Sequence, residues 1–204
     1  MSILSAMRSS KKIGLSVISA GIIISQAFVG NAFASGSFYA VYQANGALND
    51  WSLYPFSLPH SDLHLAIQGI GCKHADSSYN GSFIFSQLTG DLQTVAVDVT
   101  GIPNNSTITK IQIQPCAGFH QAGFNASKLA VFYRWNGVNG PLSSDYNLFF
   151  DPVPTLQATT TFSGLTLSKT SNHDILGIGV MNTDNGDEGI DVSVLSAKIT
   201  YTTP

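Results

Sequence analysis

Near its carboxyl end the chain reads IDVSVLSAKITYT, from Ile190 to Thr202. Apolar and polar residues alternate along this stretch, and a period of two is typical of a β-strand with one buried face. The apolar residues change parity midway, between Val194 and Leu195, and a strand that changes its buried face needs one extra residue. The stretch therefore predicts a long strand with a β-bulge near Val194.

Eight further stretches show the same alternation and are enriched in β-branched and aromatic residues. They are residues 38–43, 63–68, 82–85, 92–97, 107–114, 128–135, 160–167 and 175–181. Turn signals such as Asn-Gly and Gly-Asp separate them, and no eleven-residue window sustains a helical period. Nine to ten short strands without helices between them predict a single all-β domain, an antiparallel β-sandwich of jelly-roll type.

The amino-terminal segment predicts export. Three cations, Arg8, Lys11 and Lys12, precede an apolar run over residues 13–30. The first 34 residues contain no acid, and they end with Ala32-Phe33-Ala34. These are the parts of a secretory signal peptide, with an uncleaved membrane anchor as the alternative. Cleavage after Ala34 would leave a signal peptide of residues 1–34 and a β-sandwich domain of residues 35–204. The expected destination is the periplasm or the outside of the cell.

The charge balance restricts the partners of the exported chain. The 204 residues hold 9 Lys and Arg against 12 Asp and Glu, and loss of the first 34 residues leaves six cations against twelve acids. A net charge of −6 argues against nucleic acid, whose recognition needs a basic face. It also disfavours anionic membrane surfaces, and nothing after residue 34 is apolar enough to span a bilayer. We therefore expect no membrane contact after signal removal.

The two cysteines, Cys72 and Cys116, both belong to the exported part of the chain. In an oxidising compartment an isolated pair predicts one disulfide. Closing a loop of about 45 residues would stabilise the fold by about 4 kcal/mol in the chain-entropy model. A metal pair or a reactive thiol is the alternative, but there is no CxxC spacing and no histidine at ligand spacing from both cysteines.

Motifs of common enzyme classes are absent from the sequence. It has no GxSxG, no HExxH and no glycine-rich phosphate loop. Glu188 is the only glutamate, so no pair of carboxylates typical of sugar hydrolysis stands out. An enzymatic role is therefore less favoured than a binding role, and no catalytic residue is assigned.

Three residues could hold a transition metal: His60, Asp62 and His64. In a strand these alternate residues would share one face and offer three nitrogen or oxygen ligands. The alternative is an exposed polar face opposite Leu63 and Leu65, since no fourth ligand is apparent.

A second candidate metal site lies between residues 182 and 191. Its carboxylates are hard oxygen ligands that suit calcium, the one cofactor that the sequence suggests: Asp184, Asp187, Glu188 and Asp191. The segment departs from the EF-hand pattern. The alternative is a solvated hairpin turn, because Asp and Asn also tolerate turn geometry.

Aromatic residues supply the candidate ligand-binding surface: Trp51, Tyr54, Tyr133 and Trp135. Exposed on a strand or loop beside Asn, Gln and Asp, their rings could pack against sugar rings while the polar groups bind hydroxyls. The alternative is that these rings fill the core.

Together these features predict an exported, non-catalytic β-sandwich whose loops or exposed face bind a ligand, with carbohydrate as the first candidate. A structural or adhesive surface protein that binds other proteins is the alternative from a different class. A secreted hydrolase that uses Asp, His and metal is the third hypothesis.

Overall fold

The computed structural model describes residues 34–44, 48–54, 59–74, 81–119, 127–148, 154–184 and 189–204. Residues 33–204 belong to one compact unit. The strands of the described residues are β1 (Ser35–Tyr39), β2 (Tyr42–Gln43), β3 (Ser52–Tyr54), β4 (Gly69–Ile70), β5 (Lys73–His74), β6 (Phe83–Ser86), β7 (Leu92–Val97), β8 (Thr107–Phe119), β9 (Ser127–Trp135), β10 (Val138–Asn139), β11 (Tyr146–Leu148), β12 (Thr155–Leu156), β13 (Thr160–Ser168), β14 (Leu176–Asn182) and β15 (Ile190–Thr202).

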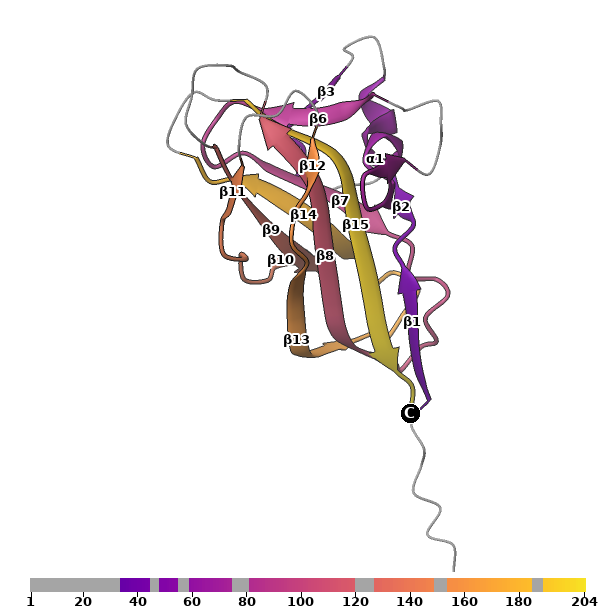
Figure 1. Ribbon diagram of the computed structural model, residues 1–204. Coiled ribbons are helices and arrows are strands. Elements are labelled where there is room, and N and C mark those ends of the chain that lie inside the picture. Colours follow the sequence, from indigo (N-terminus) through magenta and orange to yellow (C-terminus); the bar gives the residue numbers. More distant parts are fainter. Residues whose placement is uncertain are drawn as a thin grey trace, which may run out of the picture. The chain divides into compact units, whose positions relative to one another are not determined.

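Two large antiparallel sheets form most of the described part of the domain, and β4 and β5 pair as a separate two-stranded sheet. The seven-stranded sheet has the order β12-β8-β15-β6-β3, with β13 beside β8 and β1 beside β15, and it faces the viewer in Figure 1. The six-stranded sheet has the order β10-β9-β14-β7-β2, with β11 beside β9. From β6 to β9 and again from β13 to β15, successive long strands alternate between the two sheets, which gives the jelly-roll order. The predicted antiparallel β-sandwich is confirmed.

The core lies between the two sheets and follows the alternation in the sequence. Ile111 and Ile113 of β8 are fully buried, whereas Gln112 and Gln114 between and after them are only half-buried. Val131 of β9 faces the core from the opposite sheet. Such burial of β-branched and aliphatic side chains is the main stabilising term of a sandwich of this size.

The predicted bulge lies in β15. Val192 pairs with Ala117 and Val194 pairs with Cys116, so Ser193 is the extra residue. Its hydroxyl donates to the carbonyl oxygen of Cys116 at 3.3 Å. Because one residue is inserted, Val192 and Leu195 both face the core although their parity differs.

Residues 63–68 do not form the predicted strand. A 3₁₀ helix η1 (His60–Asp62) continues into the short helix α1 (Leu63–Ala66). Leu63, Ala66 and Ile67 are buried at helical spacing, which competes with the alternation of Leu63, Leu65 and Ile67 in the sequence. Among the described residues, no helix has the length and apolar character to cross a membrane.

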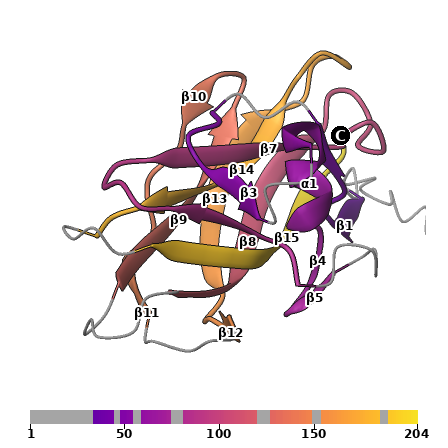
Figure 2. The ribbon, with the colours of Figure 1, turned by 90° about the horizontal axis from the view of Figure 1, so that it is seen from above.

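The Cys72–Cys116 disulfide is present, as predicted. Cys72 lies in the turn between β4 and β5, and Cys116 lies in β8. The bridge therefore joins this small hairpin to the seven-stranded sheet. Figure 2 shows β4 and β5 to one side of β15. The hairpin is also attached by Ser196, whose hydroxyl donates to the Gly69 carbonyl oxygen and accepts from the Gly71 amide.

Candidate functional site

Two of the four predicted ligand-binding aromatics lie in the core instead. Trp51 is 1% exposed, and its indole Nε1 donates to the carbonyl oxygen of Asp91 at 3.1 Å. Tyr133 is 8% exposed and meets Phe162 edge-on, with 5.3 Å between ring centroids. Neither ring has an open face for a ligand, so the surface role predicted for both residues is wrong. For Tyr133 the reason is strand register, since it shares the inner face of β9 with Leu129 and Val131. Trp51 lies just before β3, where the chain places its ring in the core.

The other two aromatics differ from each other. Trp135 is half-buried and packs against the core. Tyr54 is 42% exposed but stacks on Phe83, with 4.6 Å between ring centroids. The four predicted aromatics therefore do not form one surface, and their role in binding is not supported by their arrangement.

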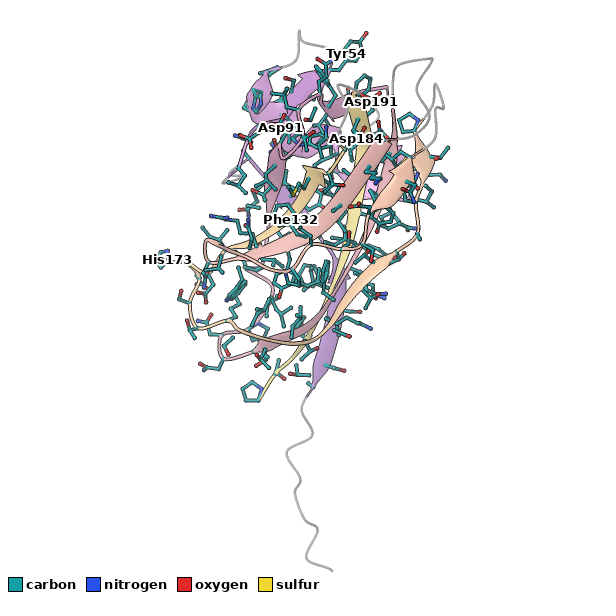
Figure 3. The ribbon with its side chains drawn as sticks, turned by 90° about the vertical axis from the view of Figure 1, so that its left-hand side faces the viewer. Tyr54, Asp91, Phe132, His173, Asp184 and Asp191 are labelled. Carbon is teal, nitrogen blue, oxygen red and sulfur yellow. A yellow bond between two sulfur atoms is a disulfide. The ribbon has the colours of Figure 1, made fainter. Side chains whose placement is uncertain are left out.

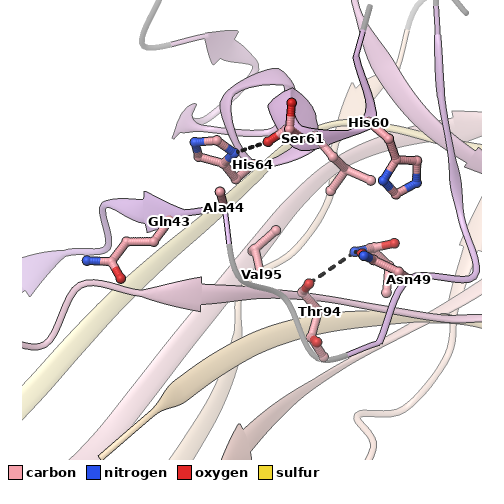
Figure 4. A pocket seen from close by; sticks show the side chains of 10 residues that line it. Gln43, Ala44, Asn49, His60, Ser61, His64, Thr94 and Val95 are labelled. Carbon is pink, nitrogen blue, oxygen red and sulfur yellow. Dashed lines mark hydrogen bonds between the residues drawn. The ribbon is translucent and has the colours of Figure 1, made fainter. Parts of the chain in front are cut away.

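His60 and His64 lie near each other through the helical turn rather than along a strand. One ring nitrogen of each contacts a backbone carbonyl oxygen, that of Trp51 at 3.2 Å and that of Ser61 at 2.8 Å. Both residues line a hollow of about 220 Å³ (Figure 4), and Asp62 does not. No group of three His, Cys, Asp or Glu within the described ranges could hold a metal ion. The predicted transition-metal set therefore does not assemble.

The floor of that hollow includes a buried amide. Gln93 is 1% exposed, and its Nε2 donates to Asn49 Oδ1 at 2.8 Å and to the Thr94 carbonyl oxygen at 3.0 Å. Because a carbonyl oxygen can only accept, this contact sets the orientation of the amide. The Gln93 Oε1 atom then has no hydrogen-bond partner.

The predicted calcium ligands are only partly described. Asp187 and Glu188 lie outside the described residues. Asp184 and Asp191 are buried, and Figure 3 shows both at the end of the domain that also holds Asp91. The Asp184 amide donates to Asn182 Oδ1 at 3.0 Å. A calcium site in this segment stays a prediction.

A third region is a hollow of about 240 Å³ beside the loops at the end of β7 and before β14. Asp98 and Asp174 both line it, together with the exposed His173 (Figure 3). The Thr100 hydroxyl donates to Asp98 at 2.7 Å and lowers the pKa of that carboxyl. Backbone amides lower the pKa of the Asp174 carboxyl in the same way, and the Ser171 amide has the largest effect. These hydrogen bonds hold loops, and we assign this hollow no ligand.

The outer face of the seven-stranded sheet brings together residues that are distant in the sequence. Across β1, β15, β8 and β13, four side chains stand in one row because their backbones are paired: Tyr39 opposite Lys198, Lys198 opposite Gln112, and Gln112 opposite Thr161. Ser196 and Gln114 form the next pair along β15 and β8. We call the set Tyr39, Gln112, Gln114, Thr161, Ser196 and Lys198 the polar face.

The polar face is hollowed. A depression of about 250 Å³ is lined by most of its residues, and Ile70 and Thr159 complete the rim. Ile70 comes from the β4–β5 hairpin and is exposed. On the opposite side, Gln114 Nε2 donates to the Gln157 carbonyl oxygen at 2.9 Å, which holds the segment that contains Thr159. The hollow is therefore open to solvent, and it lies between two walls that are held in place, the β4–β5 hairpin and the segment that contains Thr159.

One aromatic ring and one cation meet at the edge of this hollow. Tyr39 is 49% exposed, and Lys198 Nζ lies 5.8 Å from the centroid of its ring. An exposed cation–π contact contributes about 0.5–1 kcal/mol, so it orders Lys198 without fixing it. Gln112 Nε2 lies 3.5 Å from Thr161 Oγ1. The polar face thus offers an accessible ring, amide donors and acceptors, the Thr161 hydroxyl and an ammonium group.

No family model matches the chain, and no curated protein matches it in sequence. Among solved structures it is similar to the CBM22-1 xylan-binding domain of Xyn10C from Paenibacillus barcinonensis, at 11% identity and a TM-score of 0.35, covering 82% of this chain and 97% of that one. It is also similar to a family 16 carbohydrate-binding module, at 11% identity and a TM-score of 0.29, covering 67% and 87%.

A third similar structure is the Agl-KA catalytic domain, at 10% identity and a TM-score of 0.33. The match covers 80% of this chain and 29% of that longer one. At these identities and TM-scores, none of the three likenesses says what this chain binds.

Proposed function

We propose that the chain is an exported binding module that holds a polysaccharide on its polar face and performs no chemistry on it. The observation that supports this most is the row Tyr39–Lys198–Gln112–Thr161, which four neighbouring strands present beside an open hollow. Export rests on the predicted signal peptide alone.

A sugar ring has a flat apolar side and a rim of hydroxyls. Tyr39 offers an accessible ring to the first, and the amides of Gln112 and Gln114 both donate and accept toward the second. The hollow of about 250 Å³ is smaller than the roughly 300–1,000 Å³ of most small-molecule pockets. Because it is also open, it suits one unit of a chain that continues along the face.

The test is polysaccharide binding by titration calorimetry with residues 35–204, across a panel of soluble plant and microbial polysaccharides. Tyr39→Ala should weaken binding about tenfold, as expected for the loss of a buried aromatic contact. Gln112→Ala should weaken it about two- to tenfold through its lost hydrogen bonds. Both variants should keep the melting temperature, since both side chains lie outside the core.

Tyr54→Ala is the matched control, because it removes an exposed tyrosine from β3, which β6 separates from β15 in the strand order. It should leave the affinity for the polysaccharide unchanged. If the wild type and Tyr39→Ala bound a polysaccharide with equal affinity, the polar face would not be the binding site. Absence of binding across the panel would count against the proposed function itself.

A further inference from the structure

The two lysines on the outer face of the seven-stranded sheet lie close to each other. Lys198 pairs with Gln112, and Thr200, two residues further along β15, pairs with Lys110. Lys110 is therefore the diagonal neighbour of Lys198 on the same face, and such positions have Cα atoms about 7–8 Å apart. Two of the six cations that follow residue 34 stand on this one surface.

Neither ammonium group forms an ion pair in the described part of the chain. Lys198 makes the contact with the Tyr39 ring, and the neighbours of both lysines across the strands are uncharged. Asp191 is the single acid inside any described strand, and it lies seven residues along β15 from Lys198, roughly 20 Å away, and is 5% exposed. Within the described strands, no neighbouring carboxylate therefore neutralises the positive charge of this face.

From this charge pattern we infer that the ligand of the polar face is a polysaccharide whose sugars carry carboxylate groups, a polyuronate. The inference rests on the proposed function. An ammonium group and a carboxylate form a hydrogen bond in which both partners are charged, whereas a neutral sugar offers the ammonium group only uncharged hydroxyls. Two lysines match a chain with one charge per sugar, whereas a heavily sulfated chain calls for a denser cationic surface.

The net negative charge of the whole domain does not oppose this. At physiological ionic strength charges are screened beyond about 8 Å, so a ligand on the face responds mainly to Lys110 and Lys198. The remaining described acids lie in loops and in η1. The attraction is local, and it should weaken when salt shortens the screening length from about 10 Å at 0.1 M to about 3 Å at 1 M.

The experiment compares oligogalacturonate with its methyl ester, which keeps the sugar chain and removes the charge. We expect the wild type to bind oligogalacturonate more tightly than the ester, and the difference to shrink at high salt. Lys110→Gln and Lys198→Gln should each weaken binding of the acid about two- to fivefold, the range for an exposed ion pair, with little effect on the ester. Tyr39→Ala should weaken both.

Lys128→Gln is the matched control, since it makes the same charge change on an exposed residue of β9 in the other sheet. It should bind like the wild type. Equal affinity for acid and ester, or an equal effect of Lys128→Gln, would overturn the polyuronate inference and leave the proposed function standing. Binding of neutral polysaccharides from the panel without any binding of oligogalacturonate would do the same. If the protein bound no polysaccharide of the panel and neither form of galacturonate, both the polyuronate inference and the proposed function would be overturned.

Discussion

Trp51 shows what a single residue contributes to this sandwich. It is the largest fully buried side chain in the described core, and its indole nitrogen has a backbone partner. Replacing it with alanine would remove its packing, leave a cavity and reduce the hydrogen bonds to the Asp91 carbonyl oxygen to the one from the Asn182 amide at 3.1 Å. Trp51→Ala should lower the free energy of unfolding by about 3–5 kcal/mol in urea titrations. A Trp51→Ala variant with wild-type stability would contradict its place in the core.

Gly179 in β14 is a position where one added carbon matters. A Cβ there would lie 2.5 Å from Phe132 Cζ and 2.9 Å from the Gln93 carbonyl oxygen. Phe132 is itself fully buried (Figure 3), so it has little room to move. Gly179→Ala should therefore destabilise the protein by about 1–3 kcal/mol in denaturant unfolding.

Gly177 on the same strand is the control for this prediction. A Cβ there meets Arg134 Cβ at 3.3 Å and nothing closer. Gly177→Ala should change the free energy of unfolding by less than about 1 kcal/mol. If both variants were equally destabilised, the cause would be the loss of glycine rather than the contact with Phe132.

At the scale of residues, the sequence predicts burial well where alternation is strict. Ile111 and Gln112 face opposite sides of β8 as expected, because neighbours on a strand must. It fails for Trp51 and Tyr133, since an amphipathic ring suits a surface and a core equally. Strand register decides for Tyr133, and the path of the chain before β3 decides for Trp51. Lys169 is the extreme case: it is 1% exposed, with its ammonium bound to Asn104 Oδ1 at 2.8 Å, and nothing in its local sequence indicates burial.

Among the elements, the β4–β5 hairpin depends on the disulfide. The bridge closes a sequence separation of 44 residues, so its removal should cost about 4 kcal/mol of stability in the chain-entropy model. A Cys72→Ser, Cys116→Ser variant should show this loss in urea titration. Because the hairpin also places Ile70 at the rim of the hollow, the same variant should bind polysaccharide more weakly while still folded. Unchanged affinity for the polysaccharide would show that the hairpin does not contribute to the binding site.

The loop before β14 is tied to the turn after β9 by Asp174. Its carboxylate accepts from the Ser171 amide at 2.8 Å and from Asn136 Nδ2 at 2.8 Å. The pKa of Asp174 is lowered from its ordinary value of 3.8, chiefly by the Ser171 amide. The charged form therefore stabilises the fold above pH 3.8, and this stabilisation is lost as pH falls through the lower folded value.

Asp174→Asn should consequently be less stable than the wild type at pH 7, and the two should converge as the pH drops below 3.8. Urea titrations at pH 7, 4 and 3 measure the difference. A gap that stays constant over this range would mean that the charge of Asp174 does not contribute.

Strands are the elements that the sequence predicts best, and short helices the ones it predicts worst. The predicted strand 92–97 coincides with β7, and the bulge in β15 lies one residue from its expected place. Residues 63–68 were ambiguous because a run of six apolar and polar residues fits both a strand and one helical turn. Two- and three-residue strands such as β10 and β12 form only by pairing with a longer neighbour, so no local pattern could indicate them.

For the molecule as a whole, export is the prediction that needs its own test. Signal peptide cleavage requires small residues at the last and third-from-last positions, here Ala34 and Ala32. Ala32→Tyr should block processing of the exported chain, whereas Phe33→Tyr, between the two, should leave it intact. Mass spectrometry of the exported wild type should find Ser35 as its first residue. Normal cleavage of the Ala32→Tyr variant would refute the predicted site.

The polar face is a property of the whole fold rather than of any motif. Tyr39, Gln112, Thr161 and Lys198 come from four strands spread over 160 residues of sequence. Alternation with the buried Ile111 and Ile113 places Gln112 on the outer side of β8, but only the order of strands in the sheet brings a tyrosine and a lysine into line with it. No spacing rule could have joined them, because sandwich topology is set by contacts between distant segments.

The pairing of β1 with β15 has a mechanical consequence. The two strands are antiparallel, with Ser35 opposite Thr202 and Tyr39 opposite Lys198, and in Figure 1 the carboxyl end lies at the start of β1. A force that pulls these two ends apart acts along the direction of the hydrogen bonds between β1 and β15. It therefore breaks these bonds one after another, instead of loading all of them in shear at once. Peeling β1 away would withdraw Phe38 from its packing against the core and then remove Tyr39 from the polar face. A polysaccharide held on the polar face would then be released by a force that pulls the two ends of the domain apart.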